Sequence, residues 1–167
     1  TPADIVIADA YVKGIRDYDV EKVYAHMKNT AENSPGDGSN YSGRSGIDEY
    51  KAKGYVSADV HGSSVSLTQE YAIADFAIGQ MAAAMGKTED AAHYGERAKN
   101  YRNHWHEGTK LFLPRKGDGS FIVDFSYTDT MQNGYYSEGD PYQYNWLAPH
   151  DESGLRELFG GSEPMLA

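Results

Sequence analysis

Apolar residues recur at helical spacing along most of the chain, and this pattern predicts a mainly helical protein. A first helix is predicted over residues 3–16, because four apolar residues share one face: Ile5, Ala8, Val12 and Ile15. A second helix is predicted over residues 19–33, after a cap at Asp17 or Asp19, on an apolar face of Val20, Val23, Tyr24 and Met27. The short gap between them favours an antiparallel helical hairpin.

A second helical hairpin is predicted from the middle of the chain. Residues 64–86 are apolar nearly all round, and a helix of this kind is buried on most faces. Gly86 suits the left-handed residue that ends such a helix. Residues 88–106 are amphipathic, with acidic residues early and arginine later, as the helix dipole favours. The pattern therefore predicts one inner helix and one outer helix.

Loops and short elements separate these hairpins. Residues 34–46 are rich in glycine, serine and asparagine and are predicted to be a loop, whereas residues 47–54 are predicted to form a short helix. Two apolar runs within residues 110–125 surround the sequence KGDG, which indicates a β-hairpin. A last helix is predicted over residues 151–161, with Asp151 as its cap.

Two architectures accommodate such helix pairs, a helical-repeat solenoid and a closed α/α toroid. No period of about 34 residues recurs along the chain, as a tetratricopeptide solenoid would require. The loops are also longer than most helix–helix connections, and long loops usually carry function. We therefore favour part of a toroid. The predicted fold class is mainly α, with helical hairpins, a small β-hairpin and long loops.

Composition narrows the classes of function. The 167 residues carry a formal net charge of -10, which argues against nucleic acid as a partner, because phosphate binding needs a basic face. Cysteine is absent, which excludes disulfides, zinc–thiolate sites and a cysteine nucleophile. No apolar run is long enough to predict a membrane span. The 14 tyrosines supply rings with polar tips, which suit binding clefts and sugars in particular.

Carboxylates are the strongest candidates for chemistry, because the chain has neither a G-x-S-x-G nucleophile elbow nor an H-E-x-x-H zinc motif. His61 and His150 lie in irregular segments and are weaker candidates. Glu138 lies in YYSEGDPYQYNWLAPHD, close to several rings. A carboxyl group enclosed by rings is desolvated, which keeps it protonated and able to act as a general acid. This pattern alone leaves open a surface charge beside a packed aromatic turn.

Two segments of the chain resemble glycoside hydrolase family 92. The first, GYVSADVHGSSVSLTQEYAIADFAIGQMAAAMGK, is similar to the family's GYVPADV…SVSLTLEYAYDDWAIAQLAKALGK. The second, YYSEGDPYQYNWLAPHDESGLRELFGG, resembles YTEGNAWQYTWFVPHDVQGLIELMGG. The similarity is dense and runs from about Ile47 to Ser162.

This resemblance implies a calcium-dependent, exo-acting α-mannosidase that inverts anomeric configuration, with an (α/α)6 toroid as catalytic domain. Glu138 occupies the place of the general acid in the family motif EGNAWQY. The residues that the resemblance places at or near the substrate are Asp59, His61, Arg115, Tyr142, Gln143, Trp146, His150 and Asp151. Asp140, Pro141 and Tyr142 replace the asparagine, alanine and tryptophan of the motif. These departures keep the acid but change its surroundings.

The resemblance also implies that parts of the enzyme lie elsewhere. The family's general base and most of its Ca²⁺ ligands belong to segments that residues 1–167 do not contain. Because the chain begins with Thr1 and closes on GGSEPMLA, we expect both ends to be cut. Residues 1–167 would then be a single partial domain, with an N-terminal β-sandwich and the C-terminal part of the toroid absent, and inactive alone.

The implied partners are a mannose-containing glycan and the missing parts of the parent chain, and the implied location is secreted or periplasmic. A function of another class is also compatible with the sequence. The chain could be a non-catalytic scaffold, either a helical repeat or a carbohydrate-binding domain, that keeps the fold without the reaction.

Overall fold

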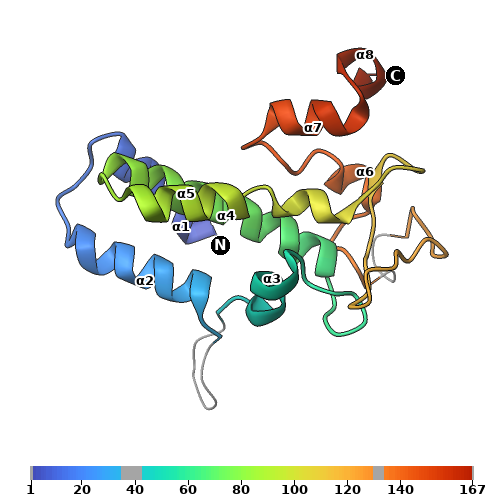
Figure 1. Ribbon diagram of the computed structural model, residues 1–167, viewed down its shortest axis with the longest axis horizontal. Coiled ribbons are helices and arrows are strands. Elements are labelled where there is room, and N and C mark those ends of the chain that lie inside the picture. Colours follow the sequence, from blue (N-terminus) through green and yellow to red (C-terminus); the bar gives the residue numbers. More distant parts are fainter. Residues whose placement is uncertain (1, 35–42, 130–133, 167) are drawn as a thin grey trace.

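The structure is a computed structural model that describes residues 2–34, 43–129 and 134–166, and helices dominate these residues (Figure 1). The longer helices are α1 (Pro2–Val12), α2 (Val20–Glu32), α4 (Ser64–Ala84), α5 (Thr88–Arg97) and α7 (Glu152–Phe159). The short helical segments are α3 (Ile47–Lys53), the 3-10 turn η1 (Asn100–His104), α6 (Pro141–Tyr144) and α8 (Ser162–Leu166). The described strands are β1 (Trp105–His106) and β2 (Leu111–Phe112).

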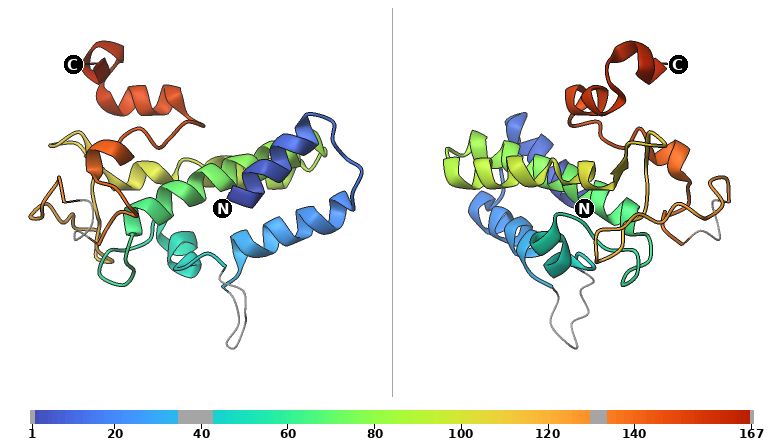
Figure 2. Two further views of the ribbon diagram at one scale, coloured as in Figure 1. Left: turned by 180° about the vertical axis from the view of Figure 1, so that it is seen from behind. Right: turned by 45° about the vertical axis from the view of Figure 1, so that its right-hand side comes forward.

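Helix α4 is the centre of the fold. Helices α1, α2 and α5 and the turn η1 all pack against it, and α1 crosses it on the side away from α5 (Figure 2). Most residues of α4 are buried, as its continuous apolar pattern predicts. Gly86, with φ +75°, follows the end of the helix, so the bounds predicted from the sequence are confirmed to within two residues.

Helices α1 and α2 pack on α4 through one apolar cluster. Its members include Ala8, Tyr11, Tyr24, Met27, Ala31, Ile78 and Met81. Helix α1 ends at Val12, earlier than its apolar pattern predicts. Asp19 is the cap of α2, because its side chain accepts a hydrogen bond from the backbone N–H of Lys22 (3.1 Å). The predicted antiparallel hairpin is thus formed only in part: α1 and α2 follow one another, but each packs mainly on the apolar surface of α4 and not on the other helix.

The prediction of one outer helix over residues 88–106 is wrong in its second half. Helix α5 ends at Arg97, and the chain continues through η1 into β1. Tyr101 and His104, both on η1, are fully buried. The tighter turn brings these two side chains into the core, so tertiary packing overrides the helical pattern of the segment.

The predicted β-hairpin exists, but its strands are not the expected ones. Strand β1 pairs with β2 in antiparallel orientation, upstream of the KGDG turn. Around KGDG itself, the pairing is a single bridge between Arg115 and Phe121. Residues 111–113 are buried, whereas Val123 is half-exposed. The strands therefore pair upstream of KGDG, where the apolar side chains are buried.

The remaining short elements agree with the sequence. Helix α3 ends at Gly54, with φ +80°. Helix α7 is capped by Asp151, which accepts a hydrogen bond from the backbone N–H of Gly154 (2.9 Å). Helices α7 and α8 project from the rest of the molecule (Figures 1 and 2). Across the described ranges, none of the helices combines the length and the apolar character that crossing a membrane demands.

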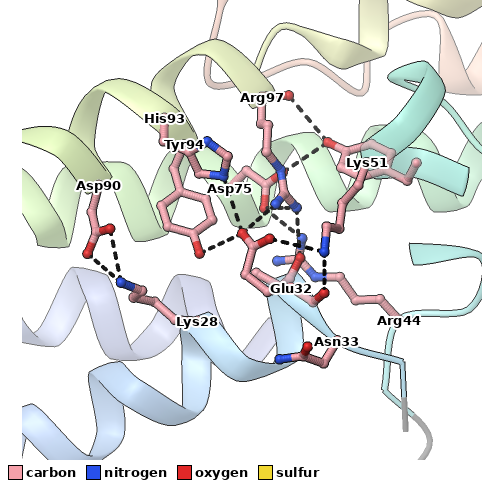
Figure 3. A network of polar contacts seen from close by, with 12 residues as sticks. Lys28, Glu32, Asn33, Arg44, Lys51, Asp75, Asp90, His93, Tyr94 and Arg97 are labelled. Carbon is pink, nitrogen blue, oxygen red and sulfur yellow. Dashed lines mark hydrogen bonds and ion pairs between the residues drawn. The ribbon is translucent and has the colours of Figure 1, made fainter. Parts of the chain in front are cut away.

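Polar contacts around buried charges connect helices α2 to α5 and the segment before α3 (Figure 3), and Asp4 of α1 joins them through Arg44 (3.5 Å). Asp75 of α4 is fully buried and accepts hydrogen bonds from Arg44 (2.6 Å) and from Arg97 Nε (2.9 Å). The hydroxyl of Tyr50 also donates to Asp75 (3.0 Å). Arg97 reaches the end of α2 as well, where it donates to Glu32 (2.6 Å). Each buried charge is thus paired, the state in which buried ions are tolerated.

A buried histidine joins η1 to the hairpin and to α4. His104 lies 2.8 Å from the carbonyl oxygen of Leu113 through Nδ1, and 3.0 Å from Thr68 Oγ1 through Nε2. Burial lowers the pKa of His104 from 6.5 to about 4. The folded protein therefore holds this imidazole neutral, in a structural role.

We expect His104 to make stability fall in mild acid. Between pH 6.5 and about 4 the unfolded chain binds a proton that the folded chain does not. The contribution is complete above pH 6.5, declines as the pH falls towards 4, and amounts to about 3 kcal/mol in total. The pH dependence of the unfolding free energy measures it. His104→Gln should flatten that dependence, whereas the same change at the exposed His26 should not; equal profiles for both variants would contradict the expectation.

Candidate active site

Glu138 follows a segment, residues 134–137, that runs along the first turn of α4. Two backbone N–H groups at the start of the helix donate to carbonyl oxygens of this segment, Ser63 to Gly134 (2.7 Å) and Val65 to Tyr135 (3.2 Å). N–H groups at a helix start have no intrahelical partner, and Ser63 gives α4 no side-chain cap. The carbonyl groups before Glu138 therefore cap α4, and this fixes where Glu138 lies.

Side chains of α4 and α6 hold the same turn from another direction. Ser66 Oγ accepts a hydrogen bond from the backbone N–H of Ser137 (2.8 Å). Gln69 Nε2 donates to the carbonyl oxygen of Tyr144 (3.0 Å). The hydroxyl of Tyr144 donates back to the carbonyl oxygen of Ser137 (2.8 Å). Glu138 is thus carried by a turn with fixed supports on both sides.

The backbone at Glu138 is strained. Its φ is +52°, in the left-handed region that residues other than glycine avoid at a cost of roughly 1–3 kcal/mol. Gly139 comes next, and a Cβ there would lie 2.7 Å from the ring of Tyr144. The side chain of Glu138 is exposed, so the described residues do not enclose it as the aromatic pattern led us to expect.

Two residues that depart from the family motif, Asp140 and Pro141, stabilise the start of helix α6. Asp140 is the N-cap of α6 and forms a capping box with Gln143, in which each side chain accepts from the other residue's backbone N–H (2.9 and 3.2 Å). Pro141 is the first residue of this helix, where proline is well tolerated. Asparagine and aspartate are equivalent caps, so the local geometry survives the change.

Two large rings beyond Glu138 are half-exposed. Tyr142 has 53% of its surface exposed and Trp146 has 52%. The Trp146 ring stacks on Phe159 of α7, with 5.8 Å between centroids and 11° between planes. Both rings are thus accessible at the surface, as ring contacts to a sugar would require, but neither lines the hollow that contains Glu138.

A hollow of about 300 Å³ lies beside the candidate acid and is called the Glu138 hollow. Its lining residues are Glu70, Ser137, Glu138, Gln143, Tyr144 and Leu147. The hollow brings one expected site residue, Gln143, beside Glu138. It also contains Glu70, which the sequence did not single out.

Three other expected site residues lie away from Glu138, two of them at the KGDG turn and His61 beside α3. Asp59 accepts a hydrogen bond from the backbone N–H of Gly117 (2.9 Å), and Arg115 donates to a carbonyl oxygen of the same turn (2.8 Å). His61 lies 4.0 Å from Glu49. In the described part of the chain these side chains support a corner of the fold, and none lines the Glu138 hollow.

The last two expected residues join the start of α7 to the end of α5 and to η1. His150 bonds through Nε2 to the carbonyl oxygen of Ala98 (2.8 Å), and burial lowers its pKa. Asp151, besides capping α7, accepts hydrogen bonds from Tyr101 (2.9 Å) and Arg102 (3.1 Å). These contacts account for the Asp151 carboxylate, whereas Nδ1 of His150 is buried without a hydrogen-bond partner among the described residues. Neither residue lines the Glu138 hollow.

The residues of α4 that face the turn were not predicted from the sequence, namely Ser66, Gln69 and Glu70. They belong to SVSLTQEY, whose helical pattern we interpreted as packing. A polar residue on a helix that is otherwise apolar all round is the signal that could have found them, because a buried polar group needs a partner.

The described residues do not form a metal centre by themselves. Within residues 2–34, 43–129 and 134–166, no three His, Cys, Asp or Glu side chains gather in a way that could hold a metal ion. The Ca²⁺ implied by the resemblance therefore does not fit this set of side chains alone, and no chemical step is assigned to it.

A helical domain that presents a carboxylate beside accessible rings and an amide defines a candidate carbohydrate-processing enzyme. The comparisons make the class specific: the chain belongs to glycosyl hydrolase family 92. The family model described as "Glycosyl hydrolase family 92 catalytic domain" matches residues 1–167. Membership confirms the family resemblance found in the sequence.

Solved structures of the family agree with the fold. A family GH92 inverting mannosidase from Bacteroides thetaiotaomicron is 31% identical, with a TM-score of 0.92 over 99% of this chain and 22% of that chain. A family GH92 α-mannosidase from the same organism is 34% identical, with a TM-score of 0.82 over 95% of this chain and 21% of that chain. The prediction of a mainly helical part of an (α/α)6 toroid is thereby confirmed.

A relative of similar identity comes from a fungus. An "uncharacterized secreted glycosidase" from Arthroderma benhamiae is 31% identical over 197 residues, which cover 99% of this chain and 25% of the relative. The chain thus spans a quarter or less of the length of the relatives it matches.

Proposed function

We propose that this chain is the acid-bearing part of a longer glycoside hydrolase, which removes terminal α-linked mannose with inversion. The observation that carries the proposal is the position of Glu138. It lies on a strained turn whose preceding residues pack against the start of α4. Its side chain is exposed and lines a hollow together with Gln143 and Tyr144. Strained residues of this kind cluster at functional sites.

Glu138 would act as the general acid. An inverting glycosidase protonates the departing oxygen with one carboxylic acid, while a second carboxylate activates water on the opposite face of the sugar. The two carboxyl groups lie roughly 6.5–9.5 Å apart, which leaves room for that water. We propose that the second carboxylate belongs to a part of the parent protein outside residues 1–167, and that the isolated chain is therefore inactive.

The named relatives support the substrate and the location. A family GH92 α-mannosidase from Bacteroides thetaiotaomicron has been solved in complex with mannoimidazole, at 33% identity to this chain. The fungal relative is named a secreted glycosidase. By similarity we propose a mannose-containing glycan as substrate and secretion of the parent protein, with Ca²⁺ held mostly by residues outside this chain.

Product stereochemistry tests the proposed function. The full-length protein, incubated with an α-linked mannobioside and calcium, should release β-mannose first, as followed by proton NMR before mutarotation. Initial α-mannose would contradict inversion. Absence of release, combined with retained binding of the disaccharide, would favour the carbohydrate-binding scaffold. The isolated 167-residue chain, measured in parallel, should release no mannose.

A further inference from the structure

Glu70 lies on the face of α4 that meets the Glu138 turn. Ser66, Gln69 and Glu70 are spaced i, i+3 and i+4, so they share one side of the helix. The first two form the hydrogen bonds to the turn and to α6 described above. Glu70 completes this row at the hollow itself, where it is one of the lining residues.

Two hollows adjoin at Glu70. Beside the Glu138 hollow, a second one of about 400 Å³ shares Glu70, Ser137 and Tyr144 with it and adds the ring of Tyr71. The Tyr71 hydroxyl donates to the carbonyl oxygen of Ser45 (3.0 Å), so this ring is fixed in place. Each volume lies in the range of small-molecule sites, roughly 300–1,000 Å³. Glu70 is thus central to a continuous concave surface with rings on it.

The carboxylate of Glu70 is half-buried and lacks any hydrogen-bond or ion-pair partner among the residues that the structure describes. Its neighbour Gln69 is fully buried, and its Oε1 likewise has no hydrogen-bond partner there. Partly desolvated acceptors without donors are costly, and native proteins rarely leave them so. Of the two, Glu70 lines the hollow, so this side of α4 presents its carboxylate beside the candidate acid, while Gln69 stays enclosed beneath it.

We propose that Glu70 is a substrate-binding residue, whose carboxylate accepts hydrogen bonds from hydroxyl groups of the sugar bound next to Glu138. A sugar supplies several O–H donors, and an ionised carboxylate is an acceptor at both oxygens. The ring of Tyr144 forms part of the same wall and offers a surface for the sugar's C–H groups. This inference rests on the proposed function and assigns a sugar-contacting role to a second carboxylate of the same site.

The test compares Glu70→Gln with Glu138→Gln in the full-length protein. Loss of a charged hydrogen bond should lower kcat/KM of Glu70→Gln by about 10- to 100-fold, equally for mannosides with good and with poor leaving groups. The Glu138→Gln loss should instead grow as the leaving group worsens. Mannoimidazole should bind Glu70→Gln more weakly by a similar factor in calorimetry. Glu96→Gln, an exposed change on α5, serves as the matched control.

Two results for Glu70→Gln would overturn the proposal. Unchanged kcat/KM and unchanged mannoimidazole affinity in Glu70→Gln would overturn the proposal. So would a shift in the half-saturating calcium concentration with normal inhibitor affinity at saturating calcium, because Glu70 would then serve a metal. If the wild-type protein binds mannoimidazole without hydrolysing mannosides, the proposed function fails. The affinity difference between wild type and Glu70→Gln then still decides the role of Glu70.

A second variant distinguishes substrate binding by Glu70 from a purely structural role. Glu70→Asp keeps the charge but shortens the side chain by one methylene group, so it should weaken inhibitor binding while the melting temperature stays at the wild-type value. A fall in melting temperature in both variants, with inhibitor affinity unchanged in the fraction that remains folded, would show that Glu70 supports the fold and would overturn the proposal.

Discussion

Glu138→Gln is expected to slow the hydrolysis of mannosides with poor leaving groups by about 10²–10⁴-fold, the usual contribution of a general acid. Glutamine keeps the size of the side chain and fits the same left-handed turn, but it has no carboxylic proton to give. A leaving group that stabilises its own negative charge needs less protonation. The loss should therefore shrink along a series of aryl mannosides as the pKa of the departing phenol falls.

The control for this series is an exposed glutamate away from the hollow. Glu96 on α5 pairs with Lys99 at the surface (2.7 Å), so Glu96→Gln should leave kcat/KM at the wild-type value for every substrate. A Glu138→Gln loss that is the same for all leaving groups would assign Glu138 to binding rather than proton transfer. An unimpaired Glu138→Gln enzyme would remove it from the site.

The fold was predictable where one physical cause dominated. Helix α4 is apolar on all sides, so burial and periodicity point to the same element, and its limits are confirmed. The segment after Arg97 shows the opposite case. Its pattern is helical, yet Tyr101 and His104 reach the core only through a 3-10 turn. Packing against residues distant in the chain decides such a turn, and local sequence does not contain that information.

The candidate site was predictable only through its motif. The place of Glu138 in the motif singled it out as the candidate acid, but did not predict what supports it. That support consists of backbone carbonyls placed against the start of a helix about 70 positions earlier, with Ser66 and Gln69 facing them. Asp59 and Asp151 belong to segments that are equally motif-like. The structure shows their carboxylates serving a turn and a helix cap.

Asp75→Asn is expected to destabilise the fold by about 3–5 kcal/mol, the usual cost of removing one partner from a buried ion pair. Asparagine matches aspartate in shape but removes the negative charge that faces Arg44 and Arg97. The Arg44 side chain is fully buried and that of Arg97 is 10% exposed, so water cannot replace the lost charge. Denaturant unfolding of the full-length protein, with amide exchange in α4 and α5 as local readout, measures the loss.

A matched substitution isolates the effect of burial. Asp9 of α1 and Lys13, just after the end of this helix, form a surface pair (2.7 Å) with side chains 57% and 68% exposed, so Asp9→Asn should cost less than about 1 kcal/mol. If Asp75→Asn costs no more than Asp9→Asn, the buried network does not hold α2, α4 and α5 together. Arg44, which Asp75 holds in place, is followed directly by Ser45, and Ser45 lines the second hollow. Asp75→Asn should therefore also weaken mannoimidazole binding.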